Sequence, residues 1–142
     1  MHRVTATEAL LAVSALHAGF QLVVSVVVYP ALADVPPERW GPSHAAHSRR
    51  ITWVVAPLYA AVAAVCVWVL VTGPVDAATA VALAGHALAA GTTALVAAPT
   101  HGRLGRDGKQ RELLRRLLLG DRVRTLGAVT ALVASLVAVA SS

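Results

Sequence analysis

Charged residues are absent from four long stretches of the chain. No Asp, Glu, Lys or Arg occurs in residues 9–33, 51–75, 77–100 and 125–142. About 20 apolar residues in a helix that rises about 1.5 Å per residue cross a hydrocarbon core of roughly 30 Å. The fourth stretch reaches this length with the arginine-flanked segment before it. A soluble bundle would need polar outer faces, which these stretches lack. The pattern therefore predicts an all-α membrane four-helix bundle.

The expected helices form a single integral membrane domain, residues 1–142, in up-down-up-down order. Their approximate ranges are 5–29, 44–72, 77–98 and 122–140. Thr5 and Glu8 form the pattern T-x-x-E, which predicts a capping box at the start of the first helix. The apolar run that follows is too long for a cleaved signal peptide. Pro30 and Pro99 are expected to end the first and third helices.

The segments that flank the apolar stretches predict loops and one surface helix. The turn GPVD should connect the second and third helices, and HGRLGRDGK (residues 101–109) should be a basic loop. The segment QRELLRRLLLGDR (residues 110–122) is amphipathic, which predicts a helix on the membrane surface or a cytoplasmic extension of the fourth helix. No internal repeat and no linker to a second domain are evident in the sequence.

The positive charges predict the orientation. Of 12 Lys and Arg residues, all but Arg3 lie between the first and second or between the third and fourth helices. Because loops rich in Lys and Arg stay in the cytoplasm, both termini should lie on the non-cytoplasmic side of the cell membrane. Only 13% of the residues are charged, and no soluble domain remains to bind nucleic acid. The single Cys66 excludes an internal disulfide and a redox-active cysteine pair.

Polar side chains recur on one face of two predicted membrane helices. In the first helix they are spaced by three or four residues and are Ser14, His17, Gln21 and Ser25. In the third helix they are spaced by seven residues and are Thr79, His86, Thr93 and Thr100. Intramembrane polar groups generally face the bundle interior. His17 and His86 each lie roughly 18–20 Å from the cytoplasmic boundary at about 1.5 Å per residue. They should share one depth near the middle of the membrane.

A second polar group lies at the expected cytoplasmic end, in and around the segment HAAHSRR (residues 44–50). His44 and His47 share a helix face, and Arg50 is expected to continue it. His101 and Arg124 should converge on the same end, so that these residues form the rim of a cavity above His17 and His86. The alternatives are that the arginines bind lipid phosphates and that the histidines are ordinary interface residues. Trp40 is expected to anchor the chain at the membrane interface.

Four segments resemble the anthrone-oxygenase-like family of small four-helix membrane proteins. They are HAGFQLVVSVVVYPALADVP, RWGPSHAAHSRRITWVVAPLY, APTHGRL and LLRRLLLGDRVRTLGAV. The residues that fit are Gly19, Tyr29, Pro30, Trp40, His44, His47, Arg50, Pro99, Leu104, Arg124 and Thr125. His101 departs from the pattern, because the family more often has Asn there. The resemblance implies oxygenation of polycyclic aromatic anthrones to anthraquinones.

Three functions stay open, and whether the protein is an enzyme stays open with them. The first is a membrane oxygenase for an apolar, anthrone-like substrate, with a histidine as the base and arginines for the oxyanion. Its expected catalytic residues are His44, His47, Arg50 and Arg124, and its expected substrate contacts are Gln21, Tyr29, Trp40 and Thr93. The second is a haem, copper or iron protein, for which the candidate ligands are His17, His86 and His101. The third is a subunit that binds or transports a lipid or small hydrophobic molecule, usually as a homo-oligomer.

Overall fold

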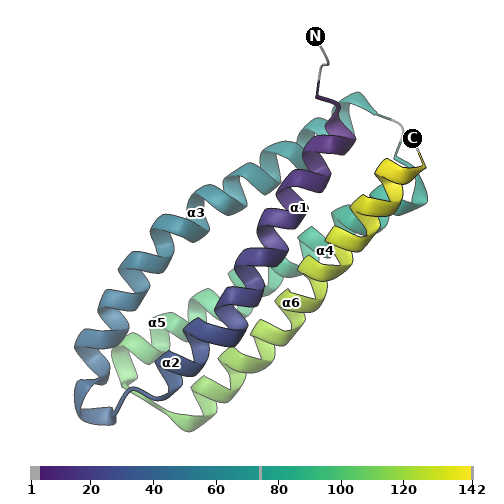
Figure 1. Ribbon diagram of the computed structural model, residues 1–142. Coiled ribbons are helices and arrows are strands. Elements are labelled where there is room, and N and C mark those ends of the chain that lie inside the picture. Colours follow the sequence, from purple (N-terminus) through teal and green to yellow (C-terminus); the bar gives the residue numbers. More distant parts are fainter. Residues whose placement is uncertain (1–3, 74, 142) are drawn as a thin grey trace.

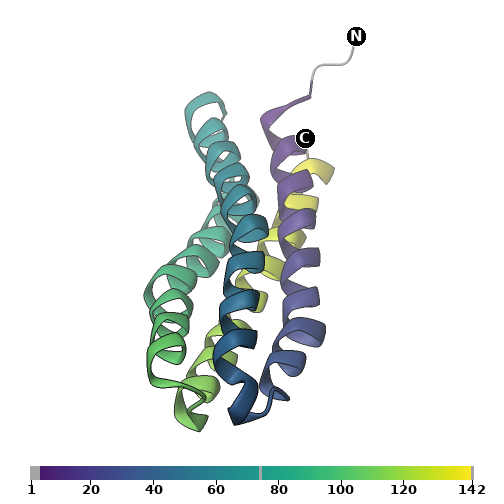
Figure 2. The ribbon, with the colours of Figure 1, turned by 90° about the vertical axis from the view of Figure 1, so that its left-hand side faces the viewer.

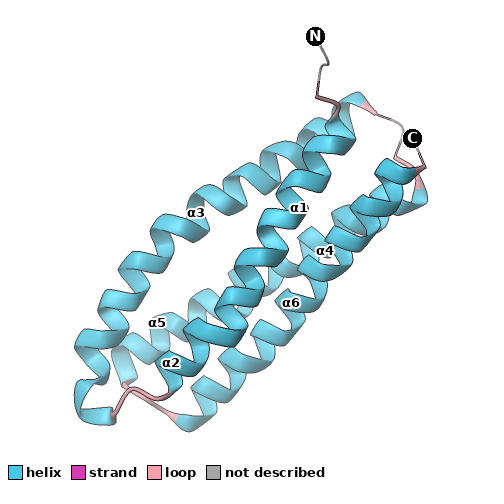
Figure 3. Cartoon of the chain, in the orientation of Figure 1, coloured by secondary structure: helices cyan, strands magenta, loops and turns pink. Residues whose placement is uncertain are grey.

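The computed structural model describes residues 4–73 and 75–141, and these form helices joined by short loops, without a strand (Figure 1, Figure 3). Two residues used in the predictions above lie outside the described residues: Arg3 and, in the turn GPVD, Pro74. The first rod joins an α-helix, a π-helical segment and a short α-helix: α1 (Ala6–Val23), η1 (Val24–Val28) and α2 (Tyr29–Ala33). The second is η2 (Pro37–Arg39), a 3-10 turn, and α3 (Trp40–Thr72). The third is α4 (Ala77–Thr92), η3 (Thr93–Ala97), also π-helical, and α5 (Ala98–Asp107), and the fourth is α6 (Arg111–Ala140).

All four rods are long and apolar enough to span a membrane, which confirms the prediction of four apolar helices. They contain 28, 36, 31 and 30 residues. Large apolar side chains point outward, among them Trp53, which is 80% exposed, and Leu95, which is 75% exposed. An apolar outer surface of this extent matches contact with lipid chains and not with water.

The helices continue past the predicted ends. Neither Pro30 nor Pro99 ends its helix, and the rods run on to Ala33 and Asp107. A proline ring clashes with the carbonyl one turn earlier and has no N–H to donate. In both rods a π-helical segment, which widens the turn, comes just before the proline and relieves this conflict.

The basic segment after Pro99 is helical and not a loop as far as Asp107. Gly108, with φ of 80°, then ends α5, because a left-handed backbone suits glycine. The fourth helix begins at Arg111, so the amphipathic segment is an extension of that helix. The second helix begins at Trp40, four residues earlier than expected.

Side-chain caps fix the starts of two helices. The predicted capping box is present: Thr5 Oγ1 accepts from the Glu8 N–H at 3.2 Å, and Glu8 Oε2 accepts from the Thr5 N–H at 2.8 Å. Asp76 caps α4 by accepting from the Thr79 N–H at 2.7 Å. This bond lowers the pKa of the Asp76 carboxyl below its ordinary value of 3.8.

The rods pack so that α1 and α4 face each other across the bundle axis. Each of them contacts both α3 and α6, and α3 leans away from α4 along much of its length (Figure 2). The closest approach is between α4 and α6. A Cβ atom at Gly85 would lie 2.5 Å from the Gly127 carbonyl oxygen, so only glycine permits this contact.

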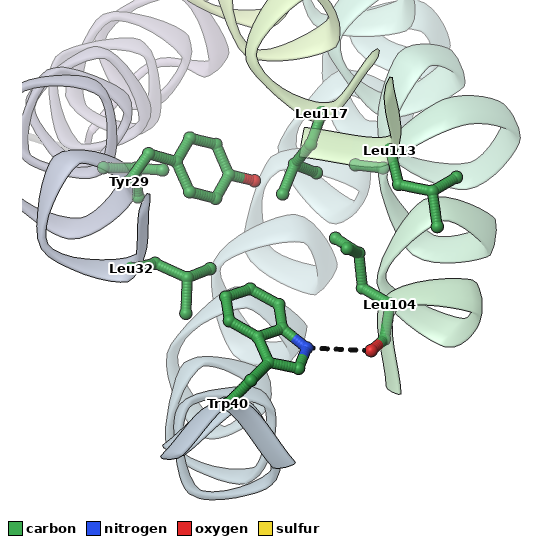
Figure 4. Packing of buried hydrophobic residues seen from close by; sticks show 8 residues of the cluster. Tyr29, Leu32, Trp40, Leu104, Leu113 and Leu117 are labelled. Carbon is green, nitrogen blue, oxygen red and sulfur yellow. Dashed lines mark hydrogen bonds between the residues drawn. The ribbon is translucent and has the colours of Figure 1, made fainter. Parts of the chain in front are cut away.

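An apolar cluster closes the end of the bundle at which α2 lies. It includes Tyr29, Leu32, Leu104 and Leu117 (Figure 4). Trp40 was expected at the membrane interface, but it is only 2% exposed and belongs to this cluster. The turn at η2 folds the indole inward, and its N–H donates to the Leu104 carbonyl oxygen at 2.9 Å. This bond satisfies the one polar group of the buried ring.

Candidate functional site

A cavity of about 260 Å³ lies between α3 and the middle parts of the first and third rods. Most of its walls are apolar and come from Phe20, Val24, Val28, Ile51, Val55, Ala97 and Ala98. Its polar lining comes from seven side chains: Tyr29, His47, Ser48, Thr52, Thr93, His101 and Arg124. Apolar walls with a few polar groups are typical of small-molecule sites, and this volume is near the lower end of their range of roughly 300–1,000 Å³.

Three buried polar atoms at this cavity have no hydrogen-bond partner among the described residues. They are His47 Nε2, Ser48 Oγ and Arg124 Nε. A buried polar atom without a partner costs about 1–3 kcal/mol, so three around one cavity form an unfavourable arrangement unless water or a ligand bonds to them. This arrangement distinguishes the cavity from the other hollows of the bundle.

The two π-helical segments create the space for the cavity. Val24 and Val28 of η1 line it from one side, and Thr93 and Ala97 of η3 line it from the other. The two segments start 69 residues apart, the same interval that separates Pro30 from Pro99 and His17 from His86. These features therefore repeat between the two halves of the chain, although no repeat is evident in the sequence.

A buried carboxylate holds Arg124 at the cavity. Asp121 Oδ1 accepts from Arg124 Nη2 at 3.0 Å and from Gln21 Nε2 at 2.6 Å. Asp121 Oδ2 accepts from Ser25 Oγ at 2.6 Å. Arg124 Nη2 also donates to Tyr29 Oη at 2.8 Å. The guanidinium is thus neutralised on one side, and its Nε–H has no hydrogen-bond partner among the described residues.

Three histidines form a stacked group next to the cavity. His44 Nε2 lies 3.2 Å from His101 Nδ1, and the ring centroids of His47 and His101 are 5.6 Å apart. His44 is buried between Trp40 and His101. The predicted convergence of these histidines with Arg124 at one end of the bundle is observed, and His47 is the one with a free buried nitrogen.

The intramembrane histidines meet in the centre of the bundle. His17 Nδ1 lies 3.1 Å from His86 Nδ1, and His86 Nε2 lies 2.9 Å from Ser14 Oγ. Ser14 Oγ lies 3.0 Å from Ser135 Oγ, which donates to the Ala131 carbonyl oxygen. The donors assign the tautomers, because each hydroxyl has one proton. Ser14 must donate to Ser135, His86 Nε2 to Ser14, and His17 Nδ1 to His86.

This arrangement does not fit a haem between His17 and His86. Axial nitrogens on opposite sides of a porphyrin must be roughly 4 Å apart, since each iron–nitrogen bond is about 2 Å, whereas the two Nδ1 atoms are 3.1 Å apart. The third expected metal ligand, His101, lies with His44 and His47 instead. Among residues 4–73 and 75–141, no group of three or more His, Cys, Asp and Glu side chains is arranged to hold a metal ion.

Several residues predicted for the site lie elsewhere. Arg50 is exposed and does not line the cavity. At 3.6 residues per turn a step of three residues falls about 60° short of a full turn. His44 is therefore buried, His47 half-buried and Arg50 outside, rather than all three on one face. Of the expected substrate contacts, Tyr29 and Thr93 line the cavity, whereas Gln21 binds Asp121 and Trp40 lies in the apolar cluster.

Three residues at or near the site were not predicted from the sequence: Asp121, Ser48 and Tyr59. Tyr59 Oη lies 2.8 Å from Thr93 Oγ1, and its ring meets His17 edge-on at 5.2 Å. Asp121 had one available signal: it is three residues before Arg124, on the same helix face. No feature of the sequence distinguished Ser48.

No protein-family model, curated protein or solved structure matches this chain. The fold and the site therefore define its class by themselves. It is an all-helical bundle of four rods, each able to span a membrane, with an apolar cavity that has a polar end.

Proposed function

We propose that this protein is an oxygenase of the cell membrane that acts on an apolar, anthrone-like aromatic substrate in the cavity at His47 and Arg124. The observation that carries the proposal is the set of three unpartnered buried atoms, His47 Nε2, Ser48 Oγ and Arg124 Nε, at the polar end of an apolar cavity. A flat aromatic ketone suits such a site, because its rings need apolar walls and its oxygen needs donors. The resemblance to the anthrone-oxygenase-like family, which includes His47 and Arg124, supports the same reaction class.

The chemistry needs a base, donors for an oxyanion and dioxygen. His47 Nε2 takes one proton from the CH₂ group that lies between the two aromatic rings. The negative charge spreads to the substrate ketone oxygen, where Arg124 Nε–H and Ser48 Oγ–H donate hydrogen bonds. Dioxygen is the oxidant: one of its atoms becomes the new ketone oxygen, and the other leaves as water with the two hydrogens of the CH₂ group. The electrons balance without a further reductant.

The proposed orientation has both termini outside the cytoplasm. The ends of α1 and α6 that lie next to the termini are at the same end of the bundle (Figure 1), and the Lys and Arg residues gather at the other end. A cysteine introduced at Val75 should react with an impermeant maleimide in intact cells, and one at Gly105 should not. Labelling at Gly105 alone would reverse the orientation.

The decisive variant is His47→Gln, because an amide can donate and accept hydrogen bonds but cannot take the proton. Detergent-purified protein would be given an anthrone under oxygen, and quinone formation and oxygen uptake would be followed. Micelles without protein measure the spontaneous oxidation that must be subtracted. We expect turnover to fall about 10²- to 10⁴-fold, the usual contribution of a general base. Arg49→Gln is the matched control, since Arg49 is exposed and has no assigned role.

Both variants should melt at the wild-type temperature, so that lost turnover is not lost folding. Equal turnover of wild type and His47→Gln would remove the proposed base. Anthrone that binds to the wild type but is recovered unchanged would instead support the binding or transport function.

A further inference from the structure

Two adjoining hollows follow α6 on the side that faces the first rod. The one nearer the α2 end has a volume of about 710 Å³, and the next has about 540 Å³. They share Leu118 and Arg122 in their linings, so they form one continuous groove. This groove is separate from the cavity at His47, with which it shares no lining residue.

The first hollow is basic. Its charged lining consists of Lys109, Arg111, Arg115 and Arg122, without an acidic residue. The three arginines lie on one face of α6, because positions i, i+4 and i+11 fall within about 40° of each other. None of them forms an ion pair with a described residue. The Lys109 ammonium is held at the edge of this hollow because it donates to the carbonyl oxygens of Ala33 and Val35.

The second hollow has fewer cationic groups. Its apolar lining consists of Leu118, Leu126 and Val129, and its polar lining consists of Ser25, Asp121, Arg122 and Thr125. Leu126 is 64% exposed. The Asp121 carboxylate in its wall is already bonded to Gln21, Ser25 and Arg124. Along α6 the cations of the groove therefore end at Arg122, and the apolar side chains of Leu126 and Val129 follow within roughly 10 Å, the rise of seven residues.

We propose that this groove binds one anionic phospholipid. Its phosphate lies on Arg111, Arg115 and Arg122, and an acyl chain lies along Leu126 and Val129. The order of the two chemistries matches a lipid from headgroup to chain, and half of a hydrocarbon core is roughly 15 Å deep. Anionic lipids are enriched in the cytoplasmic leaflet, on which the basic end of the bundle is proposed to lie. A second copy of the chain is a poorer occupant, because a symmetric contact would place these arginines against each other.

Lipid binding in the groove requires that the bundle lie in a membrane, but it does not require the oxygenase activity. Either proposal can therefore fail while the other holds. Protein in dodecyl maltoside would be titrated with phosphatidylglycerol, phosphatidylcholine or inorganic phosphate. Native mass spectrometry would count bound lipids, and thermal melting would measure stabilisation. We expect one phosphatidylglycerol per monomer, a raised melting temperature with that lipid, and neither effect with the other two probes.

Two neighbouring arginines give a matched pair of variants. Arg115 lines the groove, whereas Arg116 is exposed beside it and does not. Arg115→Gln should weaken phosphatidylglycerol binding about five-fold, the usual effect of one basic residue near anionic lipid, and Arg116→Gln should leave it unchanged. Equal losses in the two variants would show diffuse attraction without a site. Equal binding of the two lipids, an effect of inorganic phosphate alone, or a dimer without lipid would each overturn the proposal.

Discussion

Replacing Asp121 by asparagine tests the buried ion pair that holds Arg124. The carboxylate accepts three hydrogen bonds, from Gln21, Ser25 and Arg124, at 2.6, 2.6 and 3.0 Å. The side chains of Arg124 and Asp121 are only 7% and 6% exposed. Asparagine keeps the shape, but it replaces one acceptor oxygen by a donor and leaves the guanidinium without its counter-charge.

The expected cost follows from this burial. Removing one partner of a buried ion pair typically costs about 3–5 kcal/mol, because the other charge is left unpaired. The loss of an acceptor for Gln21 or Ser25 acts in the same direction. A surface pair provides the comparison: Asp107 lies 3.9 Å from Arg103, and the two side chains are 43% and 51% exposed. Asp107→Asn should cost under about 1 kcal/mol, as for other exposed pairs.

The assay is reversible unfolding in mixed micelles with increasing SDS, followed by tryptophan fluorescence and circular dichroism. The double variant Asp121→Asn with Arg124→Gln completes a cycle, because it removes both charges. It should be less destabilised than the sum of the two single variants, since neither charge is then left alone. A cost of Asp121→Asn no larger than that of Asp107→Asn, or additive effects of the two single variants, would show that no buried ion pair holds Arg124.

Two further predictions concern helix packing and capping. Gly85→Ala should destabilise the bundle by about 1–3 kcal/mol in the same assay, as overpacking does, because the new Cβ would meet the Gly127 carbonyl oxygen at 2.5 Å. Gly91→Ala, with nothing within 4 Å of the new Cβ, should be tolerated, and equal losses would argue against the close contact. The pKa of Asp76 is lowered by its bond to the Thr79 N–H, so its contribution to stability is complete above pH of about 4 and is lost as the pH falls further. Asp76→Asn should reduce this acid-side loss in pH-dependent melting, and an unchanged pH profile would contradict the assigned role of the cap.

The distribution of charged residues was enough to predict four apolar helices, because a helix in a hydrocarbon core satisfies its own backbone and needs only length and apolar side chains. The capping box at Thr5 followed from a local pattern for the same reason: both partners lie within one helical turn. The shared depth of His17 and His86 could also be predicted, because both lie at a similar distance before a proline, on faces marked by other polar residues. Their contact was decided by the packing of the helices.

Other features depended on contacts between distant parts of the chain. Pro30 and Pro99 are normal signals for helix ends, and nothing local predicts that a π-helical segment will carry the helix past each of them. Asp121 lies in an arginine-rich segment whose composition is typical of a helix on the membrane surface. It is buried because Gln21 and Ser25, about 100 residues earlier in the chain, supply its hydrogen bonds.

Arg50 and Arg124 show the same division. Both flank an apolar stretch, and the sequence predicted a catalytic role for both. Only the packing of the rods decided that Arg124 lines the cavity and Arg50 lies outside. Sequence spacing determines which residues share a helix face, but the direction of that face is set by the neighbouring helices, and this depends on interactions that are far apart in the chain.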